Sequence, residues 1–150
     1  MKAYIDTSVL LRIVLGEPRP LAEWRSIDLA LTSELTRIEA LRTIDRARIE
    51  LRLPDTAVAE RRALVLGTLD GFHLAHLDGV VLDRAAEPFP TLVRTLDAIH
   101  LATAVLSRAE HPGLVFATHD EAQATAARSL GFDVIGAPSR LARARLSQRP

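Results

Sequence analysis

Four acidic residues of this 150-residue chain lie where a short apolar run ends or where a helix is predicted to pass close to the end of a strand. They are Asp6, Glu39, Asp97 and Asp120. Asp6 directly follows a strand-like run, and Asp120 follows another at residues 114–118. Open α/β sheets bind ligands at the carboxyl ends of their strands, so these acids predict a site at that edge of a sheet.

Carboxylates that converge on one point repel each other, which raises some of their pKa values unless a cation lies among them. Oxygen ligands in a chain without cysteine favour Mg²⁺ or Mn²⁺ over zinc. Such a cation binds a phosphate oxygen, activates a water molecule and stabilises the leaving oxygen. The four acids therefore predict the hydrolysis of phosphodiesters.

Each acid also has a purely structural interpretation. Asp6 and Asp120 stand where an acid can cap the following helix, and Asp97 is placed to favour the dipole of its own helix. Glu39 would be a surface glutamate paired with Arg42 or Thr43. One common site explains all four acids more economically than four separate coincidences.

The neighbouring hydroxyl and imidazole groups are less specific. Thr7 is expected to have a structural role, whereas Ser8 and Thr118 could equally serve turns or orient water and phosphate oxygens. The histidines lack the spacing of a zinc protease. His100 and His119 are therefore expected to serve packing or surface polarity.

Strands alternate with helices along the chain, which predicts right-handed crossovers and a parallel sheet covered on both faces. The apolar patterns predict strands at residues 4–5, 28–31, 73–77, 114–118 and 133–135. Thr7 or Ser8 is expected to cap the first helix and Thr95 the helix that includes residues 97–108. Further helices are expected at residues 33–53, 55–70, after Asp78, and at 120–130.

The length suits a single domain over residues 1–150, with residues 138–150 expected to form a final helix or a tail. No apolar run approaches the roughly 18 residues of a membrane span. The first residues do not read as a secretory signal, and there is no disulfide framework, so a cytoplasmic location is the default expectation.

Nineteen basic and nineteen acidic residues cancel, so any contact with nucleic acid must be local. Arg12, Arg37 and Arg42 lie nearest the acidic motifs. Each is a candidate for phosphate binding, or alternatively a solvated charge or the partner of a nearby acid.

Residues 4–11, 33–42 and 96–104 resemble three motifs of the PIN-domain ribonucleases, and most closely those of VapC-like toxins. The order and spacing of the motifs match from residue 4 to about residue 135. The resemblance implies a three-layer PIN-like α/β fold, with a mostly parallel sheet of about five strands flanked by helices.

The same resemblance assigns the metal-binding core to Asp6, Glu39 and Asp97, often completed by an acid at the position of Asp120. It implies Mg²⁺- or Mn²⁺-dependent endonucleolytic cleavage of RNA by the toxin of a toxin–antitoxin pair. The implied partners are an RNA substrate, a cognate antitoxin protein and a second copy of the chain in a homodimer. The alternative is a catalytically inactive PIN-like module that binds RNA or protein.

Overall fold

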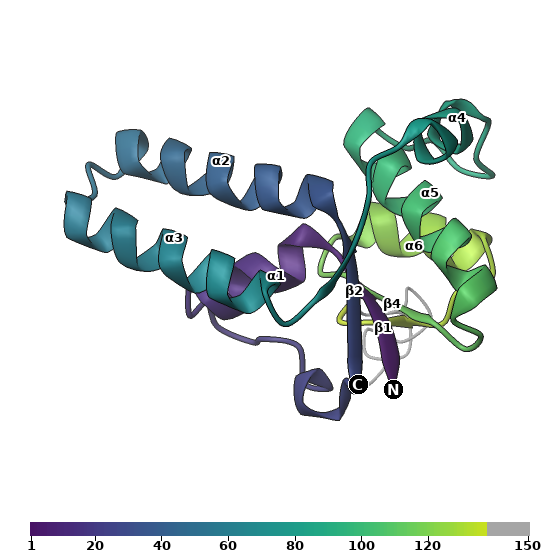
Figure 1. Cartoon of the computed structure of the whole chain (residues 1–150), viewed down its shortest axis with the longest axis horizontal. Helices are drawn as coiled ribbons and strands as arrows, with labels where there is room; N and C mark the ends of the chain where they lie inside the picture. The colour runs from purple at the N-terminus through teal and green to yellow at the C-terminus, as the bar shows by residue number, and fades with distance from the viewer. Residues whose placement is uncertain (138–150) are drawn as a thin grey trace, which may run out of the picture.

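A five-stranded sheet forms the centre of the protein, which was analysed as a computed structural model that describes residues 1–137. The strand order is β3-β2-β1-β4-β5, and every pair of neighbouring strands is parallel (Figure 1). The strands are β1 (Lys2–Ile5), β2 (Leu29–Ser33), β3 (His73–Ala75), β4 (Val115–Ala117) and β5 (Val134–Ile135). This confirms the predicted α/β fold with a parallel sheet of about five strands.

Six α-helices and a short 3-10 helix connect the strands within the described residues. They are α1 (Thr7–Val14), η1 (Trp24–Ser26), α2 (Glu34–Glu50), α3 (Asp55–Leu69), α4 (Gly79–Ala86), α5 (Thr95–Glu110) and α6 (Glu121–Ser129). Helices α2 and α3 form a long hairpin that projects away from the sheet, while α4, α5 and α6 lie together on the other side of the molecule (Figure 1). No helix among the described residues is long and apolar enough to cross a membrane.

Two predicted helix caps are wrong by one residue. Thr7 is already the first helical residue of α1, and the cap is Asp6, whose carboxylate accepts a hydrogen bond from the Ser8 backbone. Thr95 likewise opens α5 in helical conformation, after Arg94 in extended conformation, which makes no side-chain cap. Neighbouring polar residues at a helix start can each cap it, so the backbone conformation has to decide among them.

Alternating side chains of β1 divide the core between the two faces of the sheet. Tyr4 points to the face covered by α5 and α6, where it stacks on Phe116 with ring centroids 5.2 Å apart and packs in one cluster with Leu101. Ala3 and Ile5 point to the opposite face and pack in a second cluster. Burial on both faces explains why β1 is apolar throughout its central part.

A third apolar cluster joins α1 to the α2–α3 hairpin through Leu10, Ile44, Val65 and Leu69. At the start of α2 the hydroxyl of Ser33 accepts a hydrogen bond from the Leu35 backbone at 3.2 Å. The cap begins α2 at the carboxyl end of β2, and the cluster holds the helix against α1 and α3. This packing places Glu39 of α2 near Asp6. The helix or tail expected at residues 138–150 lies outside the described residues.

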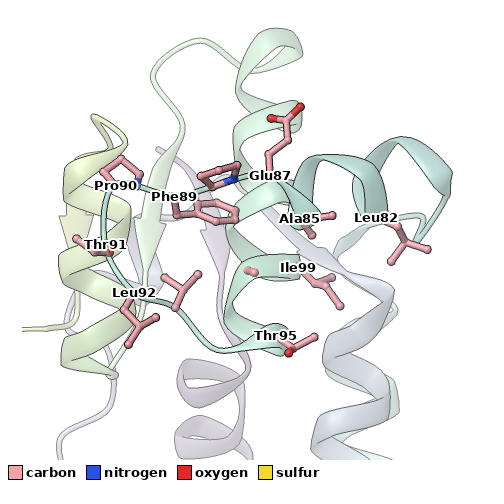
Figure 2. Close-up of a pocket in the computed structure, with 13 residues that line it drawn as sticks. Leu82, Ala85, Glu87, Phe89, Pro90, Thr91, Leu92, Thr95 and Ile99 are labelled. Atoms are coloured by element: carbon pink, nitrogen blue, oxygen red, sulfur yellow. The ribbon is translucent and has the colours of Figure 1, made fainter.

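The segment of residues 87–94, which joins α4 to α5, borders a cavity of about 710 Å³ (Figure 2). Leu82 and Ala85 of α4, Phe89 and Leu92 of the segment and Ile99 of α5 are among its lining residues. Its walls are mainly apolar, and none of the four predicted site acids lines it. This cavity is therefore separate from the predicted acidic site.

Candidate active site

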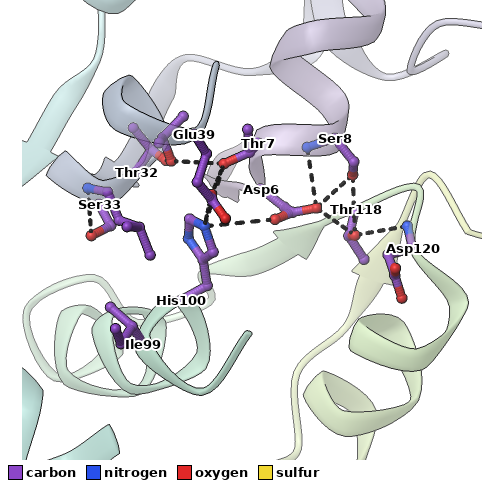
Figure 3. Close-up of polar contacts among 12 residues, drawn as sticks. Asp6, Thr7, Ser8, Thr32, Ser33, Glu39, Ile99, His100, Thr118 and Asp120 are labelled. Atoms are coloured by element: carbon purple, nitrogen blue, oxygen red, sulfur yellow. Dashed lines mark hydrogen bonds and ion pairs between the residues drawn. The ribbon is translucent and has the colours of Figure 1, made fainter. Parts of the chain in front are cut away.

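Asp6 lies at the junction of β1 and α1, and the residue is only 4% exposed. Its Oδ2 atom accepts hydrogen bonds from the Ser8 backbone at 3.3 Å, from the Ser8 hydroxyl and from the Thr118 hydroxyl at 2.9 Å (Figure 3). The capping interpretation of Asp6 is thus confirmed, and the same carboxylate also joins the ends of β1 and β4. Ser8 and Thr118 both contact it directly.

Glu39 reaches this junction from α2. Its Oε2 atom accepts hydrogen bonds from the hydroxyl of Thr7 and from Nε2 of His100, the latter at 2.7 Å. The expectation of a surface glutamate paired with Arg42 or Thr43 is wrong, because the packing of α2 on α1 turns this face of the helix inward. Arg42 instead lies 3.7 Å from Asp45. Thr7, which was expected to be only structural, holds the Glu39 carboxylate.

Nε2 of His100, on α5, faces the carboxylates of both Glu39 and Asp6 (Figure 3). The residue is 1% exposed, its Nδ1 atom lies 2.8 Å from the hydroxyl of Tyr4, and its Nε2 atom lies 4.0 Å from Oδ1 of Asp6. The predicted packing role of His100 agrees with its burial, but the polar contacts with Tyr4, Glu39 and Asp6 were not predicted. Its position three residues after Asp97 was the available signal, since residues three apart share one face of a helix.

The titration of Glu39 and His100 is coupled through their hydrogen bond. Burial would raise the pKa of Glu39, but the hydrogen bond and charge of His100 and the Thr7 hydroxyl together lower it. Burial would lower the pKa of His100, but its bond to Glu39 and the charges of Asp6, Glu39 and Asp97 raise it. Both shifts favour an imidazolium–carboxylate pair.

Asp97 and Asp120 both line a smaller cavity of about 420 Å³. The pKa of Asp97 is raised, first by burial and then by the negative charges of Asp120 and Asp6. Asp120 is exposed and caps α6, with its carboxylate accepting from the Gln123 backbone at 2.9 Å. Its own backbone N–H donates to the hydroxyl of Thr118 at 3.0 Å. Asp120 thus both caps α6 and lines the cavity next to Asp97.

The chain matches the sequence model of the family described as "PIN domain" over residues 3–129. It belongs to the PIN-domain family. Ribonuclease VapC46 and Ribonuclease VapC47 of Mycobacterium tuberculosis are 36% and 31% identical to it over 138 and 136 residues. These alignments cover 91% and 86% of this PIN domain and 97% and 92% of the two relatives.

Two solved structures share the fold of this PIN domain. VapBC2 from Rickettsia felis, bound to a DNA fragment from the promoter, has a TM-score of 0.64 at 7% identity and covers 89% of this chain and 97% of its own. A toxin–antitoxin complex from Klebsiella pneumoniae has a TM-score of 0.59 at 18% identity, and the match covers 79% of this chain and 87% of that chain. At such identities the likeness establishes the fold alone.

Hydroxyl groups link the two halves of the site in this PIN domain. The hydroxyl oxygens of Ser8 and Thr118 lie 3.4 Å apart, and the His119 backbone N–H donates to the Ser8 hydroxyl at 3.0 Å. The ring of His119 turns away, with Nδ1 lying 2.9 Å from the carbonyl oxygen of Gly136. These bonds leave His119 outside the acidic cluster.

Two of the three candidate phosphate-binding arginines have acidic partners. Arg12 lies 3.7 Å from Glu17 and Arg42 lies 3.7 Å from Asp45, which supports the ion-pair interpretation for both. Arg37 is exposed on α2. Its positive charge acts on Glu34 of the same helix, so Arg37 also has an acid nearby.

The acids suit a hard, oxygen-ligated cation in charge and donor chemistry. The repulsion that raises the pKa of Asp97 is the kind that a bound cation relieves. Within residues 1–137, however, no group of three or more His, Asp or Glu side chains is arranged to hold one ion. Asp6 and Glu39 flank His100, whereas Asp97 and Asp120 border the cavity. Side chains would have to rotate to bring three carboxylates onto one ion.

Proposed function

We propose that this PIN domain is a metal-dependent endoribonuclease that hydrolyses RNA phosphodiester bonds as the toxin of a toxin–antitoxin pair. The observation that carries the proposal is that acids from separate elements gather at one end of the sheet: Asp6 and Glu39 both approach His100, and Asp97 and Asp120 line one cavity. Relatives that match nearly the whole chain are named ribonucleases. Acids at the carboxyl end of a parallel sheet suit this chemistry.

Asp6, Glu39, Asp97 and Asp120 would hold Mg²⁺ or Mn²⁺. The ion would supply Lewis-acid stabilisation of the phosphate charge and a more acidic water. The chain's own contribution is to position these acids: Ser8 and Thr118 hold Asp6, while Thr7 and His100 hold Glu39. Positioning groups of this kind preserve the geometry that a reacting phosphate needs.

The proposed partners of the toxin are a cognate antitoxin and a second copy of the chain. Large apolar side chains stand exposed beside the acids: Ile38 precedes Glu39, Leu96 precedes Asp97, and they are 53% and 47% exposed. Exposed apolar groups around a polar site are typical of surfaces that bind proteins. The solved structure of the same fold that is described as a toxin–antitoxin complex supports this assignment.

The test is cleavage of a pool of structured and single-stranded RNAs by the purified chain with Mg²⁺, with Mn²⁺ and with EDTA. We expect metal-dependent cutting that is lost in Asp97→Asn and retained in Asp83→Asn, which changes an exposed acid of α4. Metal binding is measured in parallel by calorimetry with Mn²⁺. Absence of cutting together with intact Mn²⁺ binding would favour the alternative, an inactive PIN-like module that binds RNA or protein.

A further inference from the structure

The cavity of about 420 Å³ beside α5 and α6 is lined by two chemically different kinds of residue. Asp97 and Asp120 are its acidic residues. The other walls come from the segment before α5 and from the first turn of α6, and they are Leu92, Val93, Arg94, Ala122 and Gln123. The cavity therefore adjoins the proposed catalytic acids but offers mostly apolar and amide groups.

Gln123 is the unusual member of this lining. It is only 2% exposed, and its amide nitrogen has no hydrogen-bond partner among the described residues. Its backbone N–H is already bonded to Asp120. A buried amide without a partner destabilises a protein, so native structures rarely retain one without a reason. A ligand that completes the hydrogen bonding of Gln123 would supply that reason.

We propose that this cavity binds a nucleobase of the RNA, next to the phosphodiester bond that is cut, and that Gln123 reads the edge of that base. The proposal rests on the ribonuclease function proposed above and names a subsite of the same site. In this proposal Gln123, which is not one of the four proposed metal ligands, determines which base the enzyme prefers.

The lining favours a base over another phosphate. The carboxylates of Asp97 and Asp120 repel a further anion, whereas Leu92 and Val93 offer apolar surface to a ring. Leu92 is fully exposed in the free protein and is therefore available for such a contact. The planar guanidinium of Arg94 can stack on a base, a common way of holding unpaired RNA bases.

The amide of Gln123 suits a base edge because it offers both a donor and an acceptor. Gln side chains read bases in this way, and the correct pairing discriminates against other bases. The volume of the cavity also falls in the range of about 300 to 1,000 Å³ that is usual for small-ligand sites. The larger cavity beside α4 shares Leu92 and Val93 but is not lined by the acids.

The test measures binding and cutting separately. Fluorescence anisotropy records the affinity of the full chain carrying Asp6→Asn, which is expected to abolish cutting without changing a residue that lines the cavity, for labelled single-stranded hexanucleotides of A, of C, of U and of alternating G and U. The same measurement is repeated with Gln123→Leu added, and with Thr125→Val added as a control on α6 that does not line the cavity. Base preference in cutting is compared for the native chain, Gln123→Leu and Thr125→Val.

We expect a preference of about ten-fold for one base in binding, lost in Gln123→Leu and kept in Thr125→Val. The melting temperature of Gln123→Leu should equal or exceed that of the native chain, because the change removes an unpaired amide. Equal affinities for all hexanucleotides, or a preference that survives Gln123→Leu, would overturn the subsite even if cutting is observed. Base preference that depends on Gln123 without any cutting would uphold the subsite and overturn the nuclease.

Discussion

The hydroxyl of Tyr4 lies 2.8 Å from Nδ1 of His100, so a residue of the central strand orients a histidine of the active-site helix. Burial, followed by the charge of Asp6, raises the pKa of Tyr4 well above its ordinary value, which keeps its hydroxyl protonated. In the imidazolium form of His100 that hydroxyl accepts from Nδ1–H, while Nε2–H donates to Glu39. One chain of hydrogen bonds thus connects β1, α5 and α2.

Tyr4→Phe should destabilise the protein. The substitution keeps the ring that stacks on Phe116 but leaves Nδ1 of His100 buried without its partner, a loss of about 1–3 kcal/mol. Urea unfolding measures the change in the free energy of unfolding. Thr68→Val, which removes an exposed helix hydroxyl, is the control, and equal stability of Tyr4→Phe and the native chain would refute a role for this hydrogen bond.

His100→Ala should reduce the rate of cleavage, because it removes a hydrogen bond that holds Glu39 in place. Without Nε2, Glu39 keeps only Thr7 as a hydrogen-bond donor among residues 1–137 and can move. A misplaced group of this kind can lower a rate by about 100-fold. Steady-state kinetics should show a lower kcat with little change in KM, because the base subsite is intact. An unchanged kcat in a folded variant would contradict this positioning role.

Asp6→Asn and Asp97→Asn should both abolish cleavage but should change stability in opposite directions. The raised pKa of Asp97 means that its charge is disfavoured in the folded state, so above that pKa its removal stabilises the fold. Asp6 accepts bonds from Ser8 and Thr118, and weakening them should cost about 1–2 kcal/mol. Thermal unfolding at neutral pH measures both effects, and destabilisation by Asp97→Asn would count against a repulsive acidic cluster.

Glu34→Gln should change how stability depends on pH. The Leu77 backbone N–H, followed by His76, lowers the pKa of Glu34 in the folded state. Its ionised form therefore contributes stability above the unfolded pKa of about 4.5, and this contribution disappears as the pH falls through the lower folded pKa. Melting temperatures of the two proteins should differ at neutral pH and converge in acid, whereas a constant difference would exclude the ionised carboxylate as the cause.

Local patterns along the chain were sufficient to predict the order of elements and the places of the acids. Alternation of short apolar runs with helical patterns predicted the parallel sheet, and acids after two of those runs predicted Asp6 and Asp120 at its carboxyl edge. The assignment of Asp6, Glu39, Asp97 and Asp120 as metal ligands stays a prediction. These inferences succeed because periodicity and capping depend on neighbours only a few residues away.

Only the tertiary structure decided which side chains meet. Glu39 and His100 are 61 residues apart, and their contact depends on the packing of α2 and α5 at the end of the sheet. Gln123 looks like an ordinary polar residue in the sequence, and its burial beside Asp97 and Asp120 follows from where α6 lies against α5. The sequence by itself determined the elements and the acids at their ends, because those depend on local chemistry. The partners of each acid were decided by the angles and distances at which separate elements pack, which no local pattern encodes.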